Sequence, residues 1–151
     1  MTEETENAVN TVKQFLEKMN LKFEYDENAK VFFVPFKIDE REFMVVISIR
    51  GKWVTTAALI VRNNDLPPDL NKEEFYARLL KETFYLNEVT YGLTKDNDVI
   101  VHAETSTEAL SFDNFKTEFW SVVYGIKHFL EEIAPHYPSV RIAKPETYYI
   151  W

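Results

Sequence analysis

The spacing of hydrophobic residues changes along the chain and separates helical from extended segments. From about Glu4 to Met19, apolar residues recur every three or four positions, with lysine and glutamate between them. This period predicts an amphipathic helix with one face turned towards a core. The predicted inward positions are Val9, Val12, Phe15, Leu16 and Met19.

Residues 21–61 are dense in β-branched and aromatic side chains, a composition typical of strands. Turn-forming residues interrupt the segment at DENA, at DERE and at Arg50-Gly51-Lys52, so we expect three consecutive antiparallel strands. Gly51-Lys52 fits the two-residue loop of a type II′ hairpin, which needs glycine at its first position. This hairpin would join EFMVVISIR to WVTTAALIV.

Both faces of these strands are apolar, although an antiparallel sheet with one solvated face should alternate apolar with polar residues. Phe43, Val45, Ile47 and Ile49 alternate with Met44 and Val46, and Phe32, Val34, Phe36 and Ile38 alternate with Val31 and Phe33. We therefore expect the second face to be covered by another helix, by the C-terminal tail or by another subunit. Pro35 lacks an N–H, which favours an edge strand or a bulge.

Several signals agree on a second helix that begins after Asn71. Asn71 can cap the helix and Glu74 can complete a capping box, while Leu70 is placed to pack on Phe75. The helix is expected to end at residue 84 or 85. Its predicted inward residues are Phe75, Leu79 and Leu80.

Two short strands, VTYGL and VIVHAE, flank the acidic stretch Lys95-Asp96-Asn97-Asp98. An EF-hand loop needs spaced acidic ligands, a central glycine and a glutamate at its twelfth position. Here the acidic residues are adjacent and no glycine follows. Because Asp and Asn tolerate left-handed backbone angles in tight turns, we predict a hairpin here and no metal site.

The last helical period starts near residue 111 and continues to about residue 134, where Pro135 ends it. Its three- and four-residue steps place one apolar row at Phe112, Phe115, Phe119, Val122, Ile126, Phe129 and Ile133. Trp120, Val123 and Tyr124 widen the apolar surface, and Gly125 allows another backbone to approach closely. Two interpretations stay open: burial against the chain's own sheet, or contact with a second subunit.

Composition and charge narrow the kinds of partner. The chain has 151 residues, 46% of them hydrophobic, which suits one compact domain with a substantial core. A net charge of −8 opposes binding to nucleic acid and to anionic membranes. There is no cysteine, the opening MTEETENAVN does not read as a signal peptide, and no apolar run reaches the roughly 18 residues of a membrane span. We expect a soluble cytoplasmic protein.

Candidate catalytic or metal-binding residues are few. His128, Glu132 and His136 recur every four positions and could place three metal ligands on one helix face. However, Pro135 should end the helix before His136, and no HExxH motif is present. His102 has no serine or cysteine nucleophile motif around it, and three isolated glycines cannot build a phosphate-binding loop. We therefore predict no enzymatic activity, no metal and no cofactor.

The order of predicted elements is helix, three strands, helix, two strands, helix. Three segments carry a resemblance: the meander VFFVPFKIDEREFMVVISIRGKWVTTAALI, the helix and hairpin FYARLLKETFYLNEVTYGLTKDNDVIVHAE, and the long last helix. Together they resemble the class I type III secretion chaperone-like fold, and more closely its stand-alone YbjN-like relatives. The resemblance covers residues 9–133. It rests on element order and on a loose LL…LN…YGL…D…VIV pattern, and it includes no catalytic signature.

This resemblance implies one α+β domain over residues 1–151, built on an antiparallel sheet, with an aromatic tail at residues 138–151 outside the shared core. It also implies a small acidic homodimer that binds another protein and has no enzymatic activity.

Two functional hypotheses follow. The first is a homodimeric, chaperone-like module that holds a protein client on apolar surfaces. Its expected client contacts are Phe32, Phe36 and Met44, and its expected dimer contacts are Trp120 and Tyr124. The second is a small-molecule-binding regulatory domain with a pocket between the sheet and the last helix. In either case the tail TYYIW, residues 147–151, is expected to fold back over its own domain as a strand or plug.

Overall fold

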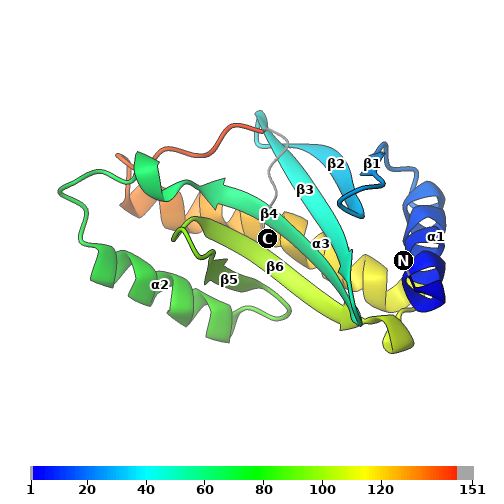
Figure 1. Ribbon diagram of the computed structural model, residues 1–151. Coiled ribbons are helices and arrows are strands. Elements are labelled where there is room, and N and C mark those ends of the chain that lie inside the picture. The colour runs from blue at the N-terminus through cyan, green and yellow to red at the C-terminus, as the bar shows by residue number, and fades with distance from the viewer. Residues whose placement is uncertain (1, 146–151) are drawn as a thin grey trace.

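A computed structural model of the chain describes residues 2–145 (Figure 1). The helices and strands are α1 (Glu3–Lys18), β1 (Glu24–Asp26), β2 (Val31–Ile38), β3 (Arg41–Arg50), β4 (Trp53–Val61), α2 (Lys72–Tyr85), β5 (Thr90–Leu93), β6 (Val99–Ser106) and α3 (Phe112–His128). This confirms the predicted order, with the short strand β1 added before the three expected strands. No helix within residues 2–145 is both long and apolar enough to cross a bilayer.

All strands belong to one antiparallel sheet with the spatial order β1-β2-β3-β4-β6-β5. Helix α3 crosses one face of this sheet over β4 and β6, and α1 packs on the same face near β3 (Figure 1). Helix α2 lies beside β5 at the edge of the sheet. The helices therefore form one layer and the sheet forms the other, as in many α+β proteins.

Strand β1 was not predicted from the sequence. It pairs only three residues with β2, from Glu24 to Asp26, which is too short to give a periodic signal. The DENA stretch forms the turn between β1 and β2, because the Asp26 carboxylate accepts hydrogen bonds from the N–H groups of Asn28 and Ala29. The predicted turn at DENA is thus confirmed, and the residues before it form a fourth strand in this part of the sheet.

Two hairpin turns adopt the tight geometries that follow the twist of a sheet. Arg50 pairs with Trp53, and only the first loop residue, Gly51, has a positive φ, +57°, as a type II′ turn requires. In the β2–β3 hairpin both loop residues, Asp39 and Glu40, have positive φ values of 48° and 66°, the pattern of a type I′ turn.

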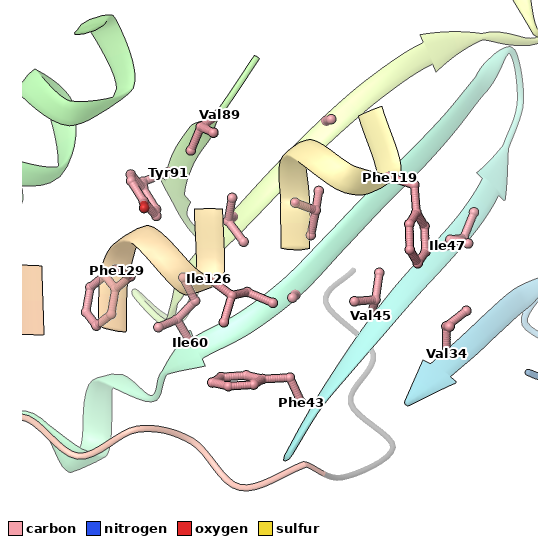
Figure 2. Packing of buried hydrophobic residues seen from close by; sticks show 14 of the residues in the cluster. Val34, Phe43, Val45, Ile47, Ile60, Val89, Tyr91, Phe119, Ile126 and Phe129 are labelled. Atoms are coloured by element: carbon pink, nitrogen blue, oxygen red, sulfur yellow. The ribbon is translucent and has the colours of Figure 1, made fainter. Parts of the chain in front are cut away.

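The core lies between α3 and the first face of the sheet. Phe119, Ile126 and Phe129 of α3 and its extension meet strand residues such as Val45 and Ile60 there, and all are essentially inaccessible to solvent (Figure 2). Below we call this helix-covered side of the sheet the first face. Its dense packing confirms that most of α3 is buried against the chain's own sheet.

Gly125 marks the closest approach of α3 to the sheet. A Cβ atom at this position would lie 2.6 Å from Cγ2 of Val101 and 3.0 Å from Cγ1 of Val89. The Tyr91 hydroxyl also donates a 2.6 Å hydrogen bond to the Gly125 carbonyl oxygen. A close approach at Gly125 is therefore confirmed, but it is made by side chains of β5, of β6 and of the residue before β5 and not, as predicted, by another backbone.

The end of α3 is shaped by Pro135. After His128 the chain continues as a π-helical turn, Phe129–Ile133, and a 3₁₀ turn, Ala134–His136. Because Pro135 has no N–H, the regular hydrogen-bond ladder cannot continue through it. One carbonyl near this end, that of Glu132, accepts a 3.2 Å hydrogen bond from the Arg78 guanidinium of α2.

The opposite side of the sheet, which we call the second face, has no helix across it in the described part of the chain (Figure 1). The sequence suggested that a helix, the C-terminal tail or another subunit covers this face. Within residues 2–145, it is the C-terminal segment that contacts it. Ala143 packs against Leu59 and Ile100, and its N–H donates a 2.8 Å hydrogen bond to the carbonyl of Ile60. The aromatic stretch 147–151 lies outside the described residues.

The inward prediction for α2 is confirmed for two residues and wrong for one. Phe75 and Leu79 are buried, and Asn71 caps the helix by accepting a hydrogen bond from the Glu74 N–H. Leu80 is 69% exposed. Since α2 lies at the edge of the sheet, only a narrow face of it contacts the core, and Leu80 is turned about 100° away from Leu79.

Replacing Gly125 by alanine should destabilise the fold by about 1–3 kcal/mol, because the new methyl group overlaps Val101 and Val89. The loss should occur although alanine is the better helix former. Urea unfolding followed by circular dichroism measures it. Thr117→Ala, at an exposed position of the same helix, is the control and should stay within about 0.5 kcal/mol. A Gly125→Ala chain as stable as the native one would contradict this packing.

Glu40→Gly should stabilise the chain by about 0.5–1 kcal/mol, because glycine adopts the left-handed backbone of the β2–β3 turn without steric cost. Glu42→Gly, two residues later inside β3, should instead lower stability, since glycine weakens a strand interior. Thermal unfolding of both variants gives the comparison. Equal effects of the two substitutions would be inconsistent with the turn geometry.

Candidate protein-binding site

The three residues expected to contact a client have different surroundings. Phe32 is fully buried, with its ring packed against the rings of Phe23 and Tyr25. It presents no surface to a partner, so its assignment to client contact is wrong. The reason is β1, which the sequence did not reveal: Tyr25 pairs directly with Phe32 and closes that half of β2.

Phe36 and Met44 lie near each other at the β2–β3 end of the sheet, but their side chains point to opposite faces, because Phe36 pairs with Phe43 and Met44 pairs with Pro35. Both line an open hollow of about 440 Å³. Its lining residues are Pro35, Phe36, Lys37, Glu42, Phe43, Met44 and Pro145. The hollow combines apolar walls with one cationic and one anionic side chain, which suits a peptide segment with apolar side chains better than a bare ion.

Phe36 also connects the hollow to α3. The Phe36 and Trp120 rings contact each other edge to face, with their centroids 5.6 Å apart. Trp120 is 41% exposed, and Tyr124, one turn further along α3, is 52% exposed. We call Phe36, Trp120 and Tyr124 the aromatic ridge. Phe36, which the sequence assigned to client contact, and Trp120, which it assigned to the dimer, are therefore in contact with each other on the first face.

The edge of β2 beside this surface is half covered. Strand β1 pairs only with Val31, Phe32 and Phe33, so within the described residues the outer edge from residue 34 to residue 38 has no strand partner. Pro35 lies in this open half, which confirms its predicted place on a strand edge. Unpaired backbone groups of an edge strand are a template for adding another strand.

A second exposed apolar surface was missed by sequence reasoning. Leu80, Phe84 and Tyr85 of α2 are 69%, 81% and 79% exposed, and the rings of Phe84 and Tyr85 contact each other. We call these three residues the α2 patch. The aromatic pair at the predicted end of the helix was an available signal, but the assignment of Leu80 to the core concealed it.

A polar network holds α2 against α3. Glu82 accepts hydrogen bonds from Arg78, at 2.7 Å, and from His128, at 3.2 Å, while Arg78 also reaches the Glu132 carbonyl. Burial opposes ionisation of Glu82, but the hydrogen bonds from Arg78 and His128 hold the pKa of its carboxyl below the usual value. These bonds hold α2 in place against α3 and its extension, with the α2 patch turned towards solvent.

Glu118 of α3 carries the most altered carboxyl of the described chain. Its partial burial, together with the negative charges of Glu88 and Glu104, raises its pKa to about 7. The folded chain thus keeps a proton on Glu118 at pH values where an unfolded chain has released it.

The candidate metal ligands of the sequence have structural roles. Asp98 closes the β5–β6 hairpin, where Asn97 has a φ of 64° and the Asp98 carboxylate accepts a 2.8 Å hydrogen bond from the Asn63 N–H. The predicted hairpin is confirmed. His128 bonds Glu82, as described above. Between residues 2 and 145, no three histidine, aspartate or glutamate side chains gather in a way that could hold a metal ion.

No protein-family profile and no curated protein matches the chain. Several solved structures do match the chain, including the following three. A chain of the ExsC–ExsE complex superposes with a TM-score of 0.60 at 11% identity, covering 85% of this chain and 95% of the other. YbjN from E. coli gives 0.60 at 12% identity, covering 89% and 96%. The Yersinia pestis type III secretion chaperone SycH, in complex with a fragment of YscM2, gives 0.52 at 14% identity, covering 79% and 96%.

The chain therefore has the type III secretion chaperone-like fold that YbjN also has, and the resemblance inferred from the sequence is confirmed. Nearly the whole length of each neighbour is matched, so the common structure includes the helices as well as the sheet. At these sequence identities the similarity establishes the fold.

Glu118→Gln should change how stability depends on pH. Because the folded-state pKa of Glu118 is raised to about 7 from an ordinary value of 4.5, its contribution to stability is present below pH 4.5 and is lost as the pH rises through 7. Glutamine cannot ionise, so the variant should be more stable than the native chain at pH 8, with a smaller difference at pH 5. Thermal melts at both pH values measure this. Parallel pH profiles for the two chains would contradict the assignment.

Proposed function

We propose that this chain is a non-enzymatic, chaperone-like protein-binding module that acts as a homodimer in the cytoplasm and holds a segment of a client protein on an apolar surface. The observation that carries the proposal is the adjacency of three features: the open half of the β2 edge, the hollow containing Phe36 and Met44, and the aromatic ridge. The similarity to SycH, which was solved with a bound protein fragment, supports it.

The chemistry of this surface indicates which kind of peptide segment it would bind. An extended segment can add its backbone to residues 34–38 of β2, while alternate side chains enter the hollow and lie along the ridge. Apolar or aromatic side chains suit these positions, since Phe36, Met44 and Trp120 offer no charge. The net charge of −8 further favours a client segment that carries basic residues between the apolar ones.

The alternative of a small-molecule domain requires an open pocket between the sheet and the last helix. The expected pocket lies between the sheet and α3, and that space is filled by side chains such as Phe119, Val122 and Ile126, which are inaccessible to solvent (Figure 2). Even a methyl group added at Gly125 would collide with Val101. We therefore keep the protein-binding module as the proposed function.

For the homodimer we propose the α2 patch as the interface. The sequence assigned this role to Trp120 and Tyr124. Because Trp120 contacts Phe36, we assign it instead to the proposed client surface. On the exposed side of α2, Ala77 is small enough for close approach of a second helix. Glu73 and Lys81 lie one turn before and after it, so a two-fold antiparallel pair of α2 helices would place opposite charges together and bury Leu80 and Phe84.

Client binding can be tested with two matched tryptophan variants. Trp120→Ser should abolish recovery of the protein partner that the tagged native chain retains from its own cells. Trp53→Ser should leave recovery unchanged, because Trp53 is exposed to a similar degree but lies on the second face at the far end of β4. Quantitative mass spectrometry of the co-purified proteins gives the result. Equal recovery with both variants would rule out the ridge as the client surface.

The dimer can be tested by measuring mass in solution. At tens of micromolar the native chain should be dimeric, since interfaces of ordinary size persist at that concentration. The double variant Leu80→Ser with Phe84→Ser should be monomeric, because it removes the apolar centre of the proposed interface. Light scattering after size exclusion measures both. If Trp120→Ser were monomeric and the α2 double variant stayed dimeric, the α2 interface would be wrong. The dimer would then form through α3.

A further inference from the structure

A second open hollow lies on the second face, at the end of the sheet where β3 turns into β4 (Figure 1). We call it the Trp53 hollow. Its volume is about 690 Å³, and its lining residues are Arg50, Trp53, Thr55 and Glu104. Trp53 and Thr55 alternate along β4 with Val54, which is buried in the core, so their side chains point to the second face. None of the four lines the hollow that contains Phe36, so this place is separate from the proposed client surface.

The strand register sets the spacing of the four side chains. Arg50 of β3 pairs directly with Trp53 of β4, and Thr55 of β4 pairs with Glu104 of β6. Arg50 and Glu104 are therefore two strands and two residues apart, which at ordinary strand spacings places their Cα atoms about 12 Å from each other. The hollow thus has a cationic side chain at one end and an anionic side chain at the other, with Trp53 and Thr55 of the middle strand between them.

The anionic end is held in place by its neighbours. Oε1 of Glu104 is paired with Nδ1 of His102, which leaves Oε2 without a hydrogen-bond partner among residues 2–145. The His102 ring lies against the backbone of Gly92, since a Cβ atom there would be 3.1 Å from Nε2 of the ring. The Thr107 N–H donates a 2.8 Å hydrogen bond to the Lys52 carbonyl, which ties the end of β6 to the β3–β4 turn. Glu104 therefore offers one carboxylate oxygen at a defined place.

The cationic end and the middle of the hollow are available to a ligand. Within the described part of the chain, the Arg50 guanidinium makes neither an ion pair nor a hydrogen bond. Its planar fork of N–H donors matches a carboxylate. Trp53 is 54% exposed, and an indole face packs well on a methylene chain and attracts an ammonium group. A ligand that satisfies the whole hollow needs a carboxylate, a short apolar chain and an ammonium group, in that order.

We propose that the Trp53 hollow binds the carboxy-terminal lysine of a polypeptide. The terminal carboxylate lies on Arg50, the methylene chain on Trp53 and the ε-ammonium group on Glu104. From its carboxyl carbon to its ε-nitrogen such a residue has six single bonds of about 1.5 Å, so it extends over roughly 7–8 Å. With a hydrogen bond of about 3 Å at each end, it spans the gap between side chains whose Cα atoms are about 12 Å apart.

The charge of Arg50 favours a chain terminus over the free amino acid. Free lysine carries a second ammonium group next to its carboxylate, and the guanidinium of Arg50 repels that group. In a polypeptide the same nitrogen is an uncharged amide. Because the hollow is open, the residues that precede the lysine can leave it towards solvent.

The first test uses ε-aminocaproate, which has the carboxylate, the chain and the ammonium group without the α-nitrogen. Its dissociation constant is measured by NMR titration, from the backbone amide signal of Thr55 in isotope-labelled chain. Arg50→Gln, Glu104→Gln and Trp53→Ser should each raise this constant by at least about ten-fold. Arg41→Gln, at an exposed position near the other end of β3, removes the same charge and should bind like the native chain.

Two analogues with a single charge, caproate and hexylamine, should each bind at least about ten-fold more weakly than ε-aminocaproate. Three results would overturn the proposal. One is no change of the Thr55 signal with ε-aminocaproate at about 20 mM, a concentration at which even millimolar binding is seen. The others are equal weakening by Arg41→Gln and Arg50→Gln, and equal binding of ε-aminocaproate and either analogue.

A pair of peptides then tests the source of the ligand. Acetyl-Ala-Ala-Lys with a free carboxylate should bind at least as tightly as ε-aminocaproate, and the same peptide with an amidated terminus at least about ten-fold more weakly. Tighter binding of free lysine than of the peptide would overturn the assignment to a chain terminus. Neither the client nor the dimer takes part in these titrations, so their outcome is separate from that of the proposed function.

Discussion

The apolar character of both faces of one antiparallel sheet is the constraint on which the rest of the structure depends. A single layer of helices can cover only one face, and α1 and α3 cover the first. Helix α3 packs so closely on β6 at Gly125 that a Cβ atom at this position would overlap the Val101 side chain. The second face is apolar as well, and within residues 2–145 the C-terminal segment reaches it at Ala143, which packs on Leu59 and Ile100.

This arrangement separates three surfaces by their place in the fold. The open half of β2, the hollow and the aromatic ridge lie at one end of the sheet, where β1 stops after three residues. The α2 patch lies beside β5 at the other edge, held in position by the bonds of Glu82 to Arg78 and His128. The second face lies between them, and the C-terminal segment reaches it at Ala143. The proposed client surface and the proposed dimer surface thus lie at opposite edges of the sheet.

The sequence predicted the parts of the fold that have a local signal. Each of these signals predicts a local conformation from a few neighbouring residues. Examples are the capping residue Asn71, the glycine of the β3–β4 hairpin and the apolar row of α3. Strand β1 was missed because three residues show no period, and Leu80 was misplaced because periodicity does not reveal how much of a helix face meets the core. The contact of Phe36 with Trp120 joins residues 84 positions apart, and only the folded chain could show that they form one surface.

Hydrogen–deuterium exchange on the chain in complex with its native partner, compared with the chain alone, tests the proposed client surface most directly. Amides of residues 36–38 should exchange more slowly in the complex, because a client strand paired with β2 would accept or donate bonds along that edge, and the region around Trp120 should also gain protection. Protection confined to α2, with unchanged exchange along β2, would contradict the proposed client surface.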